Sequence, residues 1–348
     1  MTRRRPTRQT PQPRRTSQPH RTPPSRRRHR AAAAAAPLPP RLPTQSPVPV
    51  PPGVRYPAVL SAQPLWRTGL GIVAALTLYA VVTALVASSV IGVGYLTERP
   101  GVPLADYQVA ATRYASPVGF LAQSLSIAAV LGVCWLVMRS LHGLPLGWLS
   151  SVRPGLRRRY LGWCLLAAVV VLYGIVTVTA LMSDQPLVWR PQPGIVAVVA
   201  VVVLVTPLQA AAEEYLFRGY LLQALGSFFP SPWVGVVSSS LLFAALHGSQ
   251  NLPLFLNRLA FGLLAATLVL ATGGLEAGIA AHVVNNVGAY LLAGFTASIA
   301  ELRAVRALGW SDALLDVAGF ALFAVVAVLL ARRLRLPVTT PTGPGGLR

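Results

Sequence analysis

The long apolar runs that follow Trp66 constrain this chain more than any other feature of its sequence. Several of them contain about 20 residues without a charge, which is the length that an α-helix needs to cross a lipid bilayer. The composition agrees, because 54% of the residues are apolar and the mean hydropathy is +0.57. We therefore predict an all-α fold, a polytopic bundle of transmembrane helices.

The apolar runs predict about eight spans within a transmembrane domain at residues 66–333. We expect the spans near 69–95, 116–138, 160–182, 193–226, 232–248, 254–272, 275–295 and 312–331. The fourth covers 34 residues, more than one crossing needs, so it should tilt, bend at Pro207 or begin as a separate short helix. Eight crossings would place both ends of the chain on one side of the membrane.

The first 60 residues differ from the rest of the chain. They are rich in Arg, Pro and Thr and contain too few apolar residues to form a core. We predict a disordered basic tail at 1–60 and a short disordered tail at 334–348. The first tail has no apolar segment of the kind found in a cleaved signal peptide. Its arginines fit a solvated tail or anionic lipid headgroups, whereas nucleic-acid binding is not expected without interleaved aromatics or a folded module.

Arginine is unevenly distributed between the two sets of expected loops. The loop at 139–159 contains five arginines and no acid, whereas the loops on the other face mix arginines with several acidic residues. Cytoplasmic loops of membrane proteins carry an excess of basic residues. We therefore expect an integral protein of a bacterial plasma membrane, with both the N- and the C-terminus in the cytoplasm.

Two of the nine acidic residues, Glu213 and Glu214, stand side by side inside the apolar stretch 204–226. A charge at the centre of a bilayer costs at least about 2.5 kcal/mol, so such residues usually face a polar interior and are functional. Glu214 and Arg218 are four residues apart, in the order that favours an ion pair on a helix. One arginine can neutralise only one of the two carboxylates, so the ion pair with Arg218 does not explain why Glu213 lies in this apolar segment.

Two histidines, His247 and His282, also lie in apolar segments. Phe243 shares a helix face with His247, and Asn286 shares one with His282, because each pair is four residues apart. At a rise of 1.5 Å per residue, Glu213 and His247 both lie about 20 Å from the turn that joins their helices, and Asn286 lies about 18 Å from its own turn. A carboxylate, two imidazoles and an amide can therefore converge on one pocket within the membrane.

This set of groups is suited to hydrolysis by an activated water molecule. A carboxylate shielded from bulk water is a competent general base, and a neighbouring imidazole can orient the water and carry its proton. A second imidazole and an amide can donate hydrogen bonds to the oxyanion that forms on an attacked carbonyl. Alternatively, Glu213, His247 and His282 are a reasonable ligand set for Zn²⁺ with an open water position. Both alternatives lead to hydrolysis of a carbonyl bond.

Three motifs in order resemble the motif set of the CPBP family: Glu213-Glu214-x-x-x-Arg218, Phe243-x-x-x-His247 and His282-x-x-x-Asn286. This family contains intramembrane CAAX proteases and bacteriocin-processing proteins, including the type II CAAX prenyl endopeptidases. The resemblance covers a core at about 193–295. Each motif is weak alone, but the three together, on histidines within apolar segments, make a much more specific signal.

The resemblance implies an intramembrane endopeptidase that cleaves a peptide or protein at the lipid bilayer, with lipidated substrates among the candidates. Glu213 would activate the attacking water with His247, and His282 would stabilise the oxyanion with Asn286. The supporting residues would be Glu214, Arg218 and Phe243. The family is described both as metalloproteases and as metal-independent glutamate proteases, so a requirement for Zn²⁺ stays open.

Other interpretations of the same residues stay open too. A non-catalytic member of this fold would act as a bacteriocin-immunity or scaffold protein. A proton-coupled transporter would use buried Glu and His as a relay, but its inverted repeats are not expected when the polar residues are confined to the second half of the chain. Other membrane-protease motifs, such as His-Glu-x-x-His, are absent from the sequence. Cys134 and Cys164 lie in apolar runs and are expected to be buried thiols.

Overall fold

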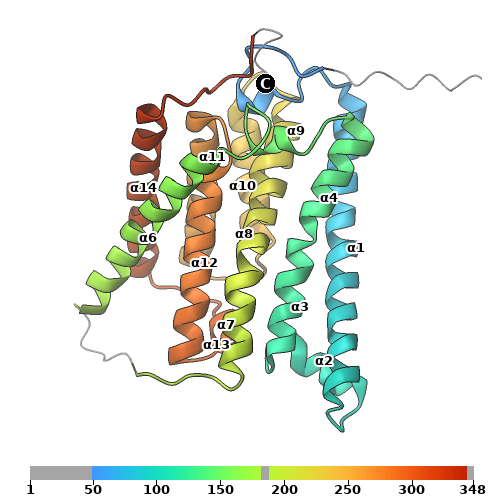
Figure 1. Cartoon of the computed structure of the whole chain (residues 1–348), viewed down its shortest axis with the longest axis vertical. Helices are drawn as coiled ribbons and strands as arrows, with labels where there is room; N and C mark the ends of the chain where they lie inside the picture. The colour runs from blue at the N-terminus through green and yellow to red at the C-terminus, as the bar shows by residue number, and fades with distance from the viewer. Residues whose placement is uncertain (1–48, 182–187, 343–348) are drawn as a thin grey trace, which may run out of the picture. The chain divides into compact units, whose positions relative to one another are not determined.

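The computed structural model describes residues 49–181 and 188–342, and these residues are organised as a bundle of helices (Figure 1). Seven of the described helical segments are long and apolar enough to cross a membrane. The all-α class expected from the sequence is therefore confirmed, and the chain is an integral membrane protein. Of the tails predicted at 1–60 and 334–348, residues 1–48 and 343–348 lie outside the described residues.

The elements follow the apolar pattern closely. The first half contains η1 (Tyr56–Ala58), α1 (Leu65–Glu98), α2 (Leu104–Thr112), α3 (Pro117–Ala128), α4 (Val130–Val137), η2 (Met138–His142), α5 (Gly147–Ser150) and α6 (Arg158–Leu181). The second half contains α7 (Ile195–Leu204), α8 (Thr206–Glu214), η3 (Tyr215–Leu221), α9 (Leu222–Gly226), α10 (Pro232–Ala245), α11 (Leu252–Thr272), α12 (Glu276–Thr296), α13 (Ile299–Ala304) and α14 (Trp310–Arg333). The short helices α2, α5 and α13 were not predicted, because they lie in connections that have no long apolar run.

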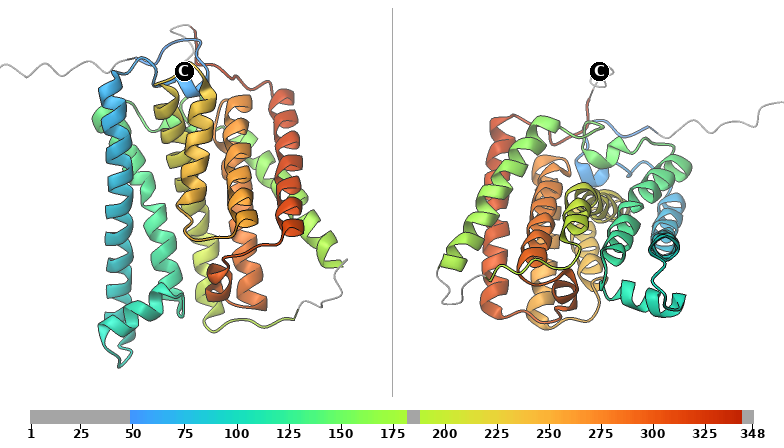
Figure 2. Two further views of the ribbon diagram at one scale, coloured as in Figure 1. Left: turned by 180° about the vertical axis from the view of Figure 1, so that it is seen from behind. Right: turned by 60° about the horizontal axis from the view of Figure 1, so that its bottom comes forward.

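Eight spans were expected, and the described residues contain seven full-length ones and a shorter eighth. The eighth is α10, which has 14 residues and rises about 21 Å, less than the hydrocarbon core of a bilayer. It nevertheless runs antiparallel to its neighbours, so that the start of α1 and the end of α14 lie at the same end of the bundle (Figures 1 and 2). Gly248, with φ +80°, follows the end of α10 in a backbone conformation that favours glycine.

The long fourth span is a stack of shorter helices. It runs from Ile195 to Gly226, and its first break lies at Val205, where φ and ψ are −108° and −39°. Pro207 follows as the second residue of α8, a position in the first helical turn where its missing N–H costs little. The break thus lies two residues before the bend that the sequence suggested.

The outward faces of the long helices are apolar. Large side chains such as Val73 and Leu85 on α1, Val170 on α6 and Leu329 on α14 are exposed. A soluble monomer rarely leaves so much apolar surface uncovered, whereas lipid tails solvate it without cost. The charged side chains of Glu214, Arg218 and Glu276, in contrast, are fully buried.

The predicted boundaries of the two tails require correction. Residues 49–60 do not continue a tail, because Tyr56 and Leu60 are buried against the bundle. Residues 334–342 are not a tail either, because Thr340 is buried and its backbone N–H donates to Val54 O at 2.9 Å. The two segments are held together by backbone pairing between Arg55 and Thr339, a long-range contact that local composition cannot reveal.

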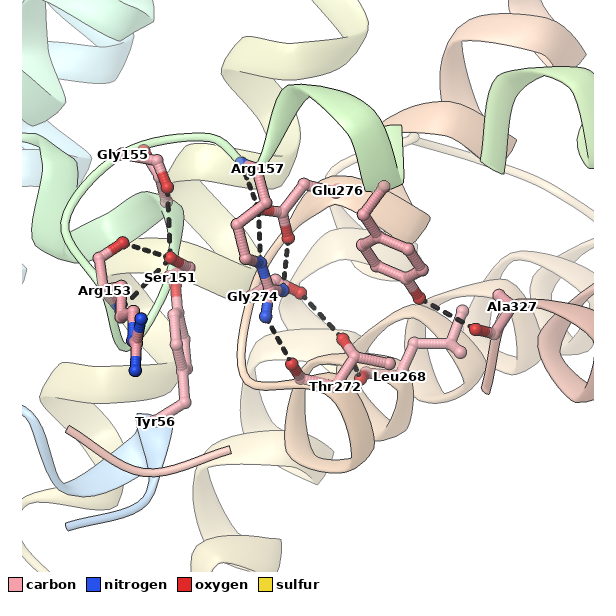
Figure 3. Close-up of polar contacts among 12 residues, drawn as sticks. Tyr56, Ser151, Arg153, Gly155, Arg157, Leu268, Thr272, Gly274, Glu276 and Ala327 are labelled. Atoms are coloured by element: carbon pink, nitrogen blue, oxygen red, sulfur yellow. Dashed lines mark hydrogen bonds and ion pairs between the residues drawn. The ribbon is translucent and has the colours of Figure 1, made fainter. Parts of the chain in front are cut away.

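An ion pair holds the loop before α6 to the start of α12 (Figure 3). Arg157 donates from Nε to Glu276 Oε1 at 2.8 Å and from Nη2 to Oε2 at 2.6 Å, and from Nη1 to Thr272 O at 2.8 Å. Glu276 is fully buried and also accepts from the Arg157 backbone N–H. Glu276 is therefore half of a bidentate clamp.

A glycine lets α1 approach the fourth span closely. A Cβ at Gly71 would collide with the hydroxyl of Tyr220 and lie 3.3 Å from Nε2 of His142. These two side chains contact each other at 3.2 Å inside the bundle. The loop expected at 139–159 includes His142, and this placement is wrong, because the span ends in a π-helical turn that carries this histidine into the core.

We expect Gly71→Ala to destabilise the protein and Gly92→Ala, on the same helix, not to do so. The methyl at position 71 must displace Tyr220, and overpacking of this kind costs about 1–3 kcal/mol. At Gly92 a Cβ meets nothing within 4 Å, so alanine should instead add up to about 1 kcal/mol of helix propensity. The melting midpoints of both purified variants in detergent test this, and equal midpoints would contradict the packing described for Gly71.

Candidate active site

Glu213 and Glu214 are the last residues of α8, inside the bundle. The seven residues that follow, η3, form a π-helical turn, and all seven are buried. π-helical turns are rare and frequently mark functional sites, because the wider turn changes the directions of the side chains. The sequence predicted a continuous α-helix here, because the local pattern of apolar residues does not distinguish an α-helix from a π-helical turn.

The ion pair expected between Glu214 and Arg218 is present. Arg218 Nη1 donates to Glu214 Oε1 at 3.0 Å, and both side chains are fully buried. The guanidinium carbon lies 4.1 Å from the centre of the Phe243 ring and 5.4 Å from that of Phe261. Aromatic faces attract a cation, so these rings supply part of the stabilisation that water would otherwise give to the charge. Phe243, predicted as a supporting residue, thus contacts the buried arginine.

His282 lies between the two carboxylates. Its Nδ1 is 2.9 Å from Glu214 Oε1, and its Nε2 is 3.4 Å from Glu213 Oε2. Gly278, one turn earlier on α12, makes this approach feasible, because a Cβ there would lie 2.9 Å from Glu214 Oε2. When it is protonated, the imidazole can donate to both carboxylates, so that Arg218 and His282 together balance two negative charges.

Glu213 is held from its other side by a glutamine. Gln209 Nε2 donates to Glu213 Oε1 at 2.7 Å, and Asn286 Nδ2 donates to Gln209 Oε1 at 3.5 Å. The sequence analysis missed Gln209, although one signal was available: it precedes Glu213 by four residues in an apolar segment and so shares its helix face. Gln209 therefore links the carboxylate to the amide of Asn286.

His247 lies beyond Phe243, just past the end of α10. Its Nδ1 is 2.8 Å from the Phe243 carbonyl oxygen, and its ring centre is 4.7 Å from that of Phe243. A carbonyl can only accept, so in the neutral ring Nδ1 carries the proton and Nε2 is the acceptor. The His247 side chain is exposed, unlike those of Glu214, Arg218 and His282, which are buried.

The donors present do not fit a zinc centre with three protein ligands. Among residues 49–181 and 188–342, no group of three or more His, Cys, Asp or Glu side chains is placed to hold a metal ion. Both ring nitrogens of His282 face carboxylates. We therefore derive no chemical step through a metal.

The structure brings five of the expected site residues into direct contact and joins the other two through a neighbouring side chain. Direct contacts join Glu213, Glu214, Arg218, Phe243 and His282, whereas Asn286 joins through Gln209 and His247 through the ring of Phe243. His282 therefore contacts the two glutamates rather than its expected partner Asn286. A cavity of about 510 Å³ lies near Arg55, Gly226 and Pro232, at the C-terminal end of the fourth span, and none of the expected site residues lines it.

Comparisons with known proteins identify the stretch that carries this cluster. Residues 192–288 match the family model described as type II CAAX prenyl endopeptidase Rce1-like. The protein YyaK of Bacillus subtilis (strain 168), described as uncharacterized, is 32% identical over 93 residues, which are 25% of this chain and 31% of the relative. The match thus spans less than a third of that relative. No solved structure matches the chain.

Arg218→Met should strongly destabilise the protein, because it leaves a fully buried carboxylate without its arginine. Breaking such a pair typically costs about 3–5 kcal/mol. The double variant Glu214→Gln, Arg218→Met should recover much of this loss, and Arg139→Met, an exposed arginine, should be neutral. Unfolding midpoints in detergent test all three. A double variant no more stable than Arg218→Met would show that the buried charge is not the cause.

Proposed function

We propose that this chain, whose residues 192–288 are a domain of the Rce1-like type II CAAX prenyl endopeptidase family, is an intramembrane endopeptidase. The family match covers less than a third of the chain, so the activity of the whole protein is our inference. The observation that carries it is the place of His282 between Glu213 and Glu214, with His247 joined to this cluster through the ring of Phe243. Few structural roles need two carboxylates and two imidazoles within a membrane bundle.

In the proposed reaction, Glu213 is the general base. Its Oε2 is the carboxylate oxygen that does not accept from Gln209, so it can receive a proton from water. His247 Nε2, an acceptor in the neutral ring, helps to orient the same water. The water oxygen then bonds to the peptide carbonyl carbon, and its proton moves to Glu213.

The oxyanion that forms needs donors, and His282 and Asn286 are the groups proposed for it. The gap of 3.4 Å between His282 Nε2 and Glu213 Oε2 is long for a charge-assisted hydrogen bond, so a substrate oxygen can compete for that nitrogen. Asn286 is held one turn further along α12 through Gln209. When the C–N bond breaks, the proton on Glu213 is transferred to the leaving amine. Glu214 and Arg218 hold His282 in place throughout.

The substrate class follows from the position of the site. The cluster lies within a bundle whose outer surface is apolar, so the substrate is a peptide or protein segment at the membrane, and lipidated chains are included. The alternative is a non-catalytic immunity or scaffold protein of the same fold. That alternative does not require His247 to be exposed next to the Phe243 ring of the cluster.

Cleavage of a hydrophobic reporter peptide by the purified protein tests the proposal. Glu213→Gln and His282→Ala should each lower kcat by at least about 100-fold, because they remove the base and an oxyanion donor. Asp312→Asn, an exposed acid outside the cluster, should leave kcat unchanged. A tight zinc chelator should not abolish activity.

Two outcomes would count against this mechanism. Turnover that survives in both variants would remove the cluster from the reaction. Activity that is lost with the chelator and restored by zinc would replace the metal-free base with a metal centre.

We further propose that the bundle lies in a bacterial plasma membrane with both termini in the cytoplasm. The support is the arginine-rich connection between α5 and α6, at the same end as the start of α1 and the end of α14, against the mixed charges at the other end (Figure 1). In this orientation, the Arg157–Glu276 clamp lies at the cytoplasmic end of the bundle, and α2 and α13 lie at the outer end. The site lies between the two ends.

Single cysteines test this orientation. The native thiols Cys134 and Cys164 are fully buried and should not react. Asp106→Cys, exposed on α2, should be labelled by a membrane-impermeant maleimide in intact cells. Arg153→Cys, exposed at the opposite end, should be labelled only after the cells are permeabilised. The reverse pattern would invert the proposed topology.

A further inference from the structure

The helix α12 presents opposite faces to α8 and α6. His282 and Asn286 lie on one face, where they contact side chains of α8. Val284 and Gly288 lie on the opposite face, because two residues turn an α-helix by about 200°. This second face packs against α6, where Tyr173 contacts it. A contact that fixes the second face therefore also fixes how far His282 and Asn286 reach towards α8.

Tyr173 occupies the space that Gly288 leaves beside α12. Its hydroxyl donates to Val284 O at 2.9 Å. A Cβ at Gly288 would collide with this hydroxyl and with the edge of the ring, so the glycine is what lets the phenol reach the carbonyl. A carbonyl oxygen has two lone pairs, so Val284 O can accept from the phenol and still accept from the N–H four residues later in the helix. The contact thus fixes the distance between α6 and α12 without breaking the helix.

Two contacts from the side of α6 hold α12, and they bracket His282. The bidentate clamp on Glu276 fixes the first turn of α12, directly before α6 begins. The contact of Tyr173 with Val284 lies eight residues further along α12, a rise of about 12 Å. His282 lies between these two levels, and Asn286 lies just beyond the second. The turn that carries Asn286 is therefore held by Tyr173 rather than by the clamp.

Asn286 depends on the position of α12 more than His282 does. Its Nδ2 donates to Gln209 Oε1 at 3.5 Å, which is long for a hydrogen bond. His282 is held more closely, since its Nδ1 is 2.9 Å from Glu214 Oε1. A small movement of α12 away from α8 would therefore break the contact of Asn286 first. The amide proposed as an oxyanion donor would then lose its direction.

We propose that Tyr173 is a positioning residue for the endopeptidase reaction. Through the backbone of Val284, it holds the turn of α12 that directs the amide of Asn286 at the oxyanion. This inference rests on the proposed function. The alternative is an ordinary hydrogen bond between membrane helices that adds only stability. The two differ in what the loss of one hydroxyl should change.

Cleavage of the hydrophobic reporter peptide by the full chain tests the proposal, with Tyr160 as the matched control. Tyr160 also lies on α6, and its hydroxyl donates to a backbone oxygen too, Ala327 O on α14 at 3.0 Å. Tyr173→Phe and Tyr160→Phe each keep the ring and remove one interhelical hydrogen bond, so both should lower the melting midpoint slightly. Only Tyr173→Phe should lower kcat, by about tenfold and with KM unchanged, because a misdirected donor weakens binding of the transition state alone.

A second substitution shows whether Tyr173 acts through Asn286. Asn286→Ala removes the amide that Tyr173 is proposed to position. Tyr173→Phe added to Asn286→Ala should therefore lower kcat by less than about twofold more, because residues that act as one unit are not additive. Losses that multiply in the double variant would show that Tyr173 does not act through this amide.

A third measurement does not depend on turnover. The sequence contains four asparagines, so the full chain with ¹⁵N-labelled asparagine gives four side-chain amide signals: Asn251, Asn257, Asn285 and Asn286. The signal that is lost in Asn286→Ala identifies Asn286. Tyr173→Phe should shift this signal and leave those of Asn251 and Asn257, on the segment of α11, in place. Tyr160→Phe should shift none of the four.

Two results would overturn the proposal. An Asn286 signal that does not move in Tyr173→Phe would show that the phenol does not hold this turn. An active protein in which Tyr173→Phe leaves kcat unchanged, or lowers it no more than Tyr160→Phe does, would reduce the contact to a structural one. A shifted signal in a protein that cleaves no reporter would leave the hold of Tyr173 on Asn286 standing while the endopeptidase function failed.

Discussion

Two adjacent carboxylates inside a membrane bundle need positive charge close by, and the rest of the cluster depends on this requirement. Glu214 shares one oxygen between Arg218 and His282, at 3.0 and 2.9 Å. Glu213 has His282 on one oxygen and a neutral amide on the other. Glu214 is thus held by the closer contacts, and Glu213 has the looser contact that its proposed role as general base requires.

Packing around the cluster follows from the same requirement. The Phe243 and Phe261 rings cover the arginine, and Gly278 allows α12 to reach Glu214. The orientation of α12 matters, because it carries His282 and Asn286. Glu276 fixes the first turn of this helix through Arg157, six residues before His282, so an ion pair at the end of the bundle helps to position an imidazole within it.

The sequence could predict whatever depends on local pattern. Long apolar runs gave the spans to within a few residues, and spacing on a helix gave the ion pair of Glu214 and Arg218. What it could not predict depends on contacts between distant segments. The π-helical turn after Glu214, the buried His142, the pairing of Arg55 with Thr339 and the position of His282 between both glutamates are of this kind. Gln209 is an intermediate case. Its spacing of four residues from Glu213 is visible in the sequence, but its contact with the amide of Asn286 on α12 is not.

The arginines of the folded part divide according to their partners. Arg157 and Arg218 face carboxylates, and the removal of either would leave a buried negative charge, so these two residues stabilise the fold. Arg258 and Arg303 face an amide and a phenol, and partners of this kind hold a guanidinium in place without neutralising it. A protein gains no stability from leaving charge uncompensated at the edge of a membrane bundle. Arg157 and Arg218 are therefore the arginines whose loss the fold should tolerate least.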